Sequence, residues 1–134
     1  MKRILILLLS IAAIPRVDAE ILVLDQTTDS TPAYQWILSL EPPLRLPKWE
    51  KGKEPPLSPG EAEKKAYAWT RKQPLAGYLP ERPFQMTLAK LPPPCDQDYV
   101  YKVNYGSEQG KTTFWTVFLL MDGTLIGPTQ RPAK

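Results

Sequence analysis

Proline is the residue type that most constrains how this chain can fold. Six prolines stand between positions 42 and 59, in "PPLRLPKWEKGKEPPLSP". Each proline fixes φ and removes a backbone donor, so this stretch can be neither a helix interior nor a central strand. It also carries Leu44, Leu46, Trp49 and Leu57, which a free linker would not need. We therefore predict an extended connection that wraps along a folded domain.

The first 19 residues have the three parts of a secretory signal peptide. Lys2 and Arg3 give a positive start, residues 4–14 are an apolar run, and Val17 and Ala19 suit the −3 and −1 positions of a cleavage site. An apolar run of about eleven residues, rising about 1.5 Å each, is too short to cross a hydrocarbon core of about 30 Å. We predict export to the periplasm or the extracellular space, without stable membrane insertion after cleavage.

The sequence then divides into four segments. They are a signal peptide (1–19), a β-prone and proline-rich N-terminal arm (20–57), a small α+β domain (58–128) and a C-terminal tail (129–134). Cleavage removes three of the 17 positive residues and one of the 14 negative ones, which leaves a net charge of +1. A nearly neutral chain gives no electrostatic reason to expect nucleic acid as a partner.

The composition argues against an enzyme. The chain has no histidine and a single cysteine, Cys95. Catalytic triads based on histidine and zinc sites based on imidazole or several thiolates are therefore excluded within this chain. Asp96 and Asp98 form only a fragment of a cation-binding loop, and a solvated turn is the favoured interpretation. We predict no catalytic residue, no metal site and no cofactor.

A helix is predicted over residues 58–73. Ser58 is a good N-cap, proline follows at the first helical position, and Glu61 stands three residues after the cap, as in a capping box. Ala62, Ala66 and Trp69 recur at helical spacing, and Pro74 ends the pattern. The small residues predict close packing on a sheet, with Trp69 as the one large anchor.

The remaining patterns predict strands. Two short β-prone runs lie in the arm, and four follow the helix: 21–24, 34–40, 84–91, 99–105, 112–121 and 124–126. The run before position 121 is apolar on both faces, which indicates a central strand. The predicted fold is therefore α+β, with one N-terminal helix of the domain on a three- to four-stranded antiparallel sheet, preceded by the proline-rich arm.

The pair Asp122-Gly123 follows the most apolar run. A phosphoryl-transfer site of the haloacid dehalogenase type would need a nucleophilic aspartate two residues earlier, where Leu120 stands. Asp-Gly also suits a type I′ hairpin turn, in which both central residues have positive φ. We predict that Asp122 and Gly123 have this structural role.

Three segments resemble PepSY-type exported domains: "LSPGEAEKKAYAWTRK", "YVYKVNY" and "FWTVFLLMDGTLIGP", within residues 57–127. The shared features are a helix opening on Ser/Thr-x-x-Glu-Ala, an aromatic-x-Tyr-x-Val strand and a last strand ending at an Asp/Gly turn. The arm and "PPPCDQD" have no counterpart, and the turn is shorter. The resemblance implies a small non-catalytic module that restrains or binds partner proteins outside the cytoplasm.

Aromatic residues are the best candidates for recognition. Tyr99, Tyr101 and Tyr105 share one strand face, and Trp115 lies on the next strand. They belong either to the core or, if the arm leaves one sheet face open, to a partner-binding surface. We predict a protein partner bound through an aromatic sheet face or an edge strand. The alternative is a carbohydrate- or cell-wall-binding module that uses exposed tryptophan and tyrosine.

Overall fold

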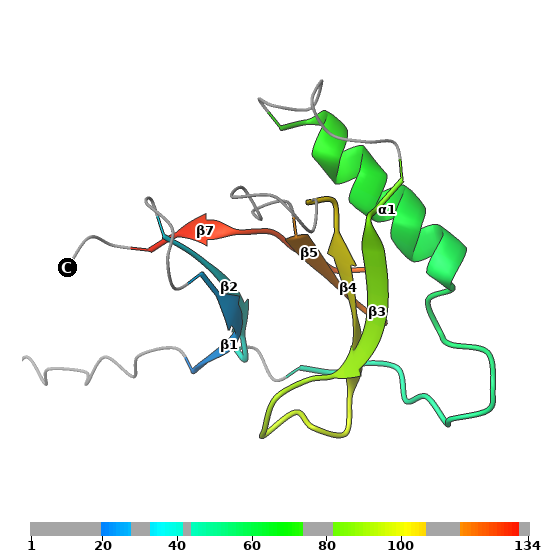
Figure 1. Cartoon of the computed structure of the whole chain (residues 1–134). Helices are drawn as coiled ribbons and strands as arrows, with labels where there is room; N and C mark the ends of the chain where they lie inside the picture. Colours follow the sequence, from blue (N-terminus) through cyan, green and yellow to red (C-terminus); the bar gives the residue numbers. More distant parts are fainter. Residues whose placement is uncertain (1–19, 28–32, 42–43, 74–81, 107–115, 132–134) are drawn as a thin grey trace, which may run out of the picture.

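The computed structural model describes residues 20–27, 33–41, 44–73, 82–106 and 116–131. One helix and two antiparallel sheets build these parts of the chain, and the predicted α+β class is confirmed. The sequence suggested the helix as the first element of the domain, but two strands precede it and it lies in the middle of the chain. The four-stranded main sheet lies between the helix on one side and the three-stranded small sheet on the other (Figure 1). The predicted signal peptide lies outside the described residues.

The main sheet has the strand order β3-β4-β5-β6. Its strands are β3 (Gln85–Lys90), β4 (Tyr99–Asn104), β5 (Thr116–Leu120) and β6 (Leu125–Ile126). All five residues of β5 are buried, as expected for a central strand that is apolar on both faces. In the register, Tyr101 lies opposite Leu119 and Lys102 opposite Phe118, so neighbouring positions of β4 and β5 face opposite layers.

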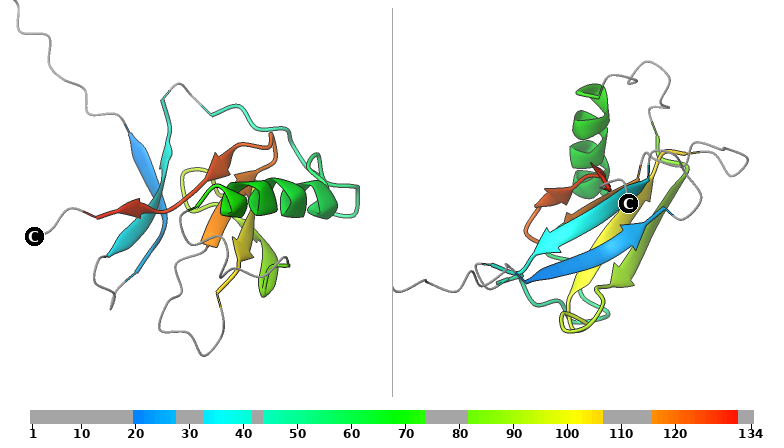
Figure 2. Two further views of the ribbon diagram at one scale, coloured as in Figure 1. Left: turned by 90° about the horizontal axis from the view of Figure 1, so that it is seen from above. Right: turned by 90° about the vertical axis from the view of Figure 1, so that its left-hand side faces the viewer.

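The small sheet is formed by β1 (Ile21–Gln26), β2 (Tyr34–Ser39) and β7 (Thr129–Gln130), in the order β1-β2-β7. The two β-prone runs of the predicted arm therefore pair with each other. Residues 129–130, which the sequence suggested as part of a tail, pair with β2. Figure 2 shows that β7 follows directly on the main sheet and reaches across to the small sheet.

Helix α1 (Pro59–Arg71) begins at the predicted cap. The Ser58 hydroxyl accepts a hydrogen bond of 3.2 Å from the backbone N–H of Glu61, which is the serine half of the capping box. Ala62 and Ala66 are fully buried against the sheet. Trp69 is half-buried, and its indole lies so close to Gly127 that a Cβ there would come within 3.1 Å of the ring.

The space between α1 and the main sheet is the helix-side core. Tyr101 and Tyr105 lie here, only 2% and 3% exposed, together with Val103, Val117 and Leu119. Of the two placements that the sequence left open for these tyrosines, the core is correct and the open partner-binding face is not. The tyrosines share a face with the strand residues that α1 covers, so helix packing removes their rings from solvent.

The opposite face of the main sheet packs on the small sheet and forms a second core. Trp36 is 2% exposed, and its indole N–H donates a hydrogen bond of 2.7 Å to the backbone carbonyl of Thr116. Its ring also meets Phe118 edge to face, with the ring centroids 6.4 Å apart. Trp36 thus fixes the small sheet to β5 by apolar burial and by one buried hydrogen bond.

The described part of the proline-rich segment wraps along the domain, as its leucines predicted. Leu46 and Leu57 are buried, one in each core. The Tyr101 hydroxyl donates a 2.8 Å hydrogen bond to the Leu57 carbonyl, which lies just before α1. Within the described residues, no helix is long and apolar enough to cross a membrane.

The turn between β5 and β6 differs from the predicted type I′. The N–H of Gly123 donates to the Leu120 carbonyl at 2.9 Å, and Gly123 has φ +88°, but no described non-glycine residue has positive φ. Asp122 is therefore a central residue of a type I turn, and Gly123 takes the left-handed position that follows it. The Asp122 carboxylate accepts from the N–H of Thr124 at 2.9 Å, which stabilises this arrangement.

We predict that Tyr101→Ala destabilises the protein strongly, because it empties a buried site in the helix-side core. The expected loss in the free energy of unfolding is about 3–5 kcal/mol. Tyr101→Phe removes only the hydrogen bond to Leu57 and should cost about 1 kcal/mol. Urea unfolding of the two variants measures both values, and an unchanged midpoint for Tyr101→Ala would contradict the burial of this ring.

We also predict opposite effects of alanine at two glycines. Gly123→Ala should destabilise the fold by about 1–2 kcal/mol, because an L-residue is strained at φ +88°. Gly60→Ala is the matched control, since a Cβ there meets nothing within 4 Å and the site lies in α1. It should stabilise by up to about 1 kcal/mol. Thermal unfolding compares the two variants, and equal effects would show that the turn conformation does not matter.

Candidate functional site

The described sheets end in four edge strands, and three of them are short or irregular. Strands β6 and β7 have two residues each. Strand β1 is longer, but its register shifts by one residue between Val23 and Asp25, as in a β-bulge. Short strands and bulges are devices that keep sheet edges from pairing with other chains.

Strand β3 is different. Its six residues pair with β4 in unbroken register, and no strand within the described residues pairs with its other side. It contains no proline, its only charge is Lys90 at the end, and every side chain except Met86 is exposed. Two large apolar side chains are exposed here, Phe84 at 53% and Leu88 at 36%. Among the described residues this edge is therefore unpaired, regular and partly apolar, which is a surface suited to strand addition.

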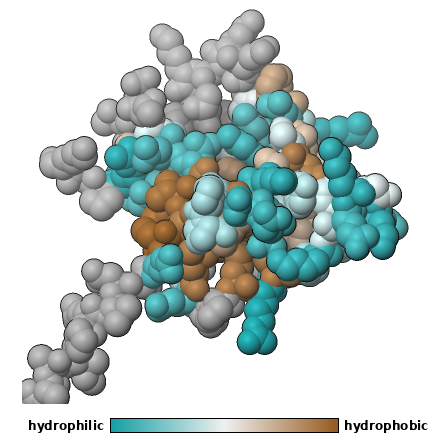
Figure 3. Space-filling view, turned by 90° about the horizontal axis from the view of Figure 1, so that it is seen from below, coloured by the Kyte–Doolittle hydropathy of each residue, from teal (hydrophilic) through white to brown (hydrophobic). Residues whose placement is uncertain are grey.

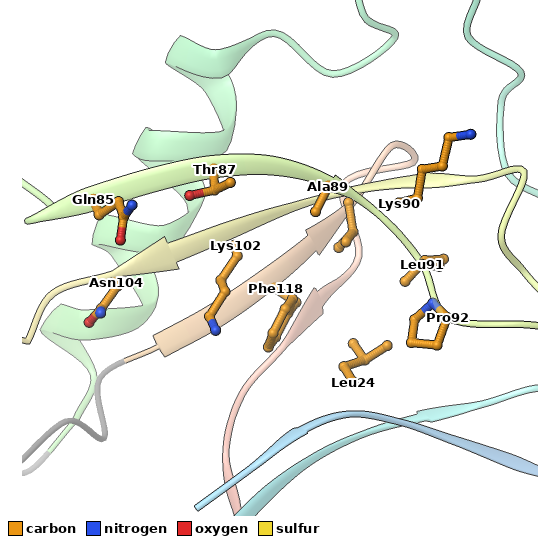
Figure 4. Close-up of a pocket in the computed structure, with 11 residues that line it drawn as sticks. Leu24, Gln85, Thr87, Ala89, Lys90, Leu91, Pro92, Lys102, Asn104 and Phe118 are labelled. Atoms are coloured by element: carbon orange, nitrogen blue, oxygen red, sulfur yellow. The ribbon is translucent and has the colours of Figure 1, made fainter.

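A cleft of about 410 Å³ runs along the inner face of β3, between the two sheets (Figure 4). It exists because the small sheet covers β4, β5 and β6 but leaves the β3 side chains on this face exposed. The lining comes from β1, β3, β4, β5 and the residues after β3. It consists of Leu24, Gln85, Thr87, Ala89, Lys90, Leu91, Pro92, Val100, Lys102, Asn104 and Phe118.

An ion pair bridges the two sheets at this cleft. The Lys102 ammonium lies 2.7 Å from a carboxylate oxygen of Asp25, and both side chains are partly exposed. Asp25 lies opposite Trp36, which faces the main sheet. Ile21 and Val23 are exposed, so strict alternation along β1 would turn Asp25 outward as well. The one-residue shift at Leu24 turns Asp25 inward instead.

A second apolar surface lies on the outer side of the small sheet. Ile21 and Val23 of β1 are 53% and 42% exposed. Figure 3, which views the molecule from below, shows hydrophobic side chains gathered on one part of its surface. The bulged edge of β1 distinguishes this surface from the regular edge of β3.

The residues suggested by the sequence for partner binding do not come together at the cleft. Tyr101 and Tyr105 are in the helix-side core, and Trp115 lies outside the described residues. Tyr99 is half-buried, with its ring centroid 4.8 Å from that of Trp49. Of the two surfaces predicted for a partner, only an open edge strand is present in the described residues.

The residues around Cys95 form a turn. Cys95 is half-buried beside the small-sheet core, and burial raises the pKa of its thiol, with the Asp98 and Glu20 carboxylates raising it further. A thiol with a raised pKa is a weak nucleophile. Asp98 forms an ion pair of 3.3 Å with Lys48. In the part of the chain that the structure describes, no three acidic or cysteine side chains are grouped as metal ligands.

Among the described residues, Tyr105 has the largest pKa shift. Burial raises the pKa of its phenol to about 12, Glu63 and Tyr67 raise it as well, and Arg71 lowers it. Its hydroxyl has no hydrogen-bond partner among the described residues. The folded state therefore favours the neutral phenol, whereas an unfolded tyrosine ionises near pH 10.

We predict that this shift makes the fold sensitive to alkaline pH. The contribution of the neutral phenol is fully present below pH 10 and is lost as the pH rises toward about 12. Tyr105→Phe keeps the packing and removes the ionisable group. Between pH 8 and pH 11, wild type should lose up to about 1 kcal/mol more stability than Tyr105→Phe in urea unfolding. Equal losses would contradict the raised pKa.

Comparison of the chain with protein-family models, with curated proteins and with solved structures finds no match in any of the three. The resemblance to PepSY-type domains therefore stays a prediction from the sequence.

Proposed function

We propose that this is an exported, non-catalytic protein that binds an extended segment of a partner protein outside the cytoplasm. The segment adds to the free edge of β3 as a further strand of the main sheet. Its main chain pairs with β3, while alternate side chains enter the cleft and cover Leu88 on the opposite face. The observation that carries this proposal is the regular, exposed edge of β3 in a fold whose other described edges are short or bulged.

The carbohydrate alternative has less support. Sugar binding by stacking needs open aromatic rings, and the described tryptophans are buried or half-buried: Trp36, Trp49 and Trp69. Trp36 and Trp49 also use their indole N–H groups for hydrogen bonds to backbone carbonyls. No feature of the described surface favours this alternative over strand addition.

The proposal is tested by selecting random eight-residue displayed peptides on the full chain. Ala89→Trp should weaken the binding of selected peptides at least tenfold, because Ala89 faces the cleft and a large ring there fills it. Ala68→Trp is the matched control, since Ala68 is an exposed residue of α1 far from the cleft in sequence and fold. Fluorescence anisotropy gives the dissociation constants, and circular dichroism checks that both variants fold.

Backbone methylation of a selected peptide tests the pairing itself. Methylating alternate amides removes donors from one edge of the bound strand only. One methylated set should abolish binding and the other should leave it nearly unchanged, because only one edge faces β3. Failure to enrich any peptide, or equal binding to the Ala89→Trp variant, would overturn the proposed function.

A further inference from the structure

We propose, building on strand addition at β3, that the bound segment is uncharged on its cleft side and places one aliphatic side chain in the cleft. The segment is a strand of a partner protein with polar, uncharged residues at one end of the cleft and this aliphatic anchor at the other. The cleft thereby determines which peptide sequences can pair with the edge of β3.

The cleft has two chemically different ends. Gln85, Thr87 and Asn104 lie at one end and offer amide and hydroxyl groups (Figure 4). Leu24 and Leu91 lie at the other end, and Phe118 lies between. An apolar side chain is stabilised only at the leucine end, where it loses contact with water, and a polar one finds partners only at the amide end.

Charge complementarity points to an uncharged occupant. Lys102 is already neutralised by Asp25 at 2.7 Å. Lys90, the other lysine of the lining, lies 5.9 Å from the Tyr99 ring centroid, and its side chain is directed away from Lys102 and Phe118 (Figure 4). The lining contains no acidic side chain. A charged group entering the cleft beside Lys102 would lose water without gaining an unpaired counter-charge there.

Successive side chains of a strand point to opposite faces, so alternate residues of the bound segment face the cleft. Gln85, Thr87 and Ala89 share the cleft face of β3, because they pair with Asn104, Lys102 and Val100 of β4. Residues of an added strand that lie beside them share this face at intervals of two positions, about 7 Å apart. The residue beside Ala89 therefore reaches the leucine end, and the residues two and four positions away reach the amide end.

Sequencing of the peptides enriched on the full chain tests this pattern. We expect one aliphatic position, with uncharged polar residues two and four positions from it. In a synthetic copy of an enriched peptide, replacing the aliphatic residue by aspartate or lysine should weaken binding at least tenfold. Raising the salt concentration from 50 to 500 mM should change the dissociation constant less than threefold, since no free charge is paired.

Two variants of the protein test the assignment of the two ends of the cleft. Ala89→Leu fills the leucine end and should weaken aliphatic-anchored peptides at least tenfold. Asp25→Asn leaves Lys102 unpaired and should strengthen a peptide with aspartate at the amide end at least threefold. Enriched peptides that bind at β3 but tolerate charge at every position would overturn the inference and leave strand addition intact. The absence of any enriched peptide would overturn both.

Discussion

The burial of β5 on both faces is the constraint on which the three layers depend. Val117 and Leu119 are in the helix-side core, while Phe118 and Leu120 are in the core beneath the small sheet. Full burial of one such side chain stabilises a fold by about 1.5–3 kcal/mol, so these four side chains together contribute about as much as the net stability of a small domain. The helix and the small sheet therefore stabilise each other indirectly, because each holds in place the strand against which the other packs. The segment before α1 is consequently part of the packed structure, and Trp36 and Leu57 are its points of attachment.

Local signals in the sequence were sufficient for most of the elements. The cap at Ser58, the proline after it and the alternating strands predict α1 and the main sheet within a few residues, because these features act over one or two turns of backbone. Strand β7 has no such signal. Its two residues are a strand because the edge of β2 lies beside them, which is a tertiary effect. The tyrosine face shows the same limit: a period of two residues shows that Tyr101 and Tyr105 lie together, but it does not show which layer covers them.

Only part of the candidate site could be predicted from the sequence. An open edge strand was one of the two surfaces that the sequence suggested, and β3 provides it. The cleft beside it depends on the one-residue shift at Leu24 and on the contact of Asp25 with Lys102, which are 77 residues apart. Neither feature follows from a local pattern, since a bulge changes the facing of one residue without changing the composition of its strand. One signal lies in β4, where Lys102 interrupts the aromatic and apolar run from Tyr99 to Val103 and therefore needs a partner or solvent.

The difference between β3 and the other edges bears on function because an open edge can pair with unwanted chains. A regular strand with free N–H and C=O groups can pair with any extended chain, and folds commonly suppress this by shortening, bending or charging the edge. Here two edges are shortened and one is bulged, so the fold uses these devices elsewhere. Strand β3 carries only a terminal lysine, and Lys102 in the adjoining cleft is paired with Asp25. An edge kept regular and six residues long in such a fold is the basis of the proposed strand addition, and in that proposal the two-ended cleft restricts which segments can bind.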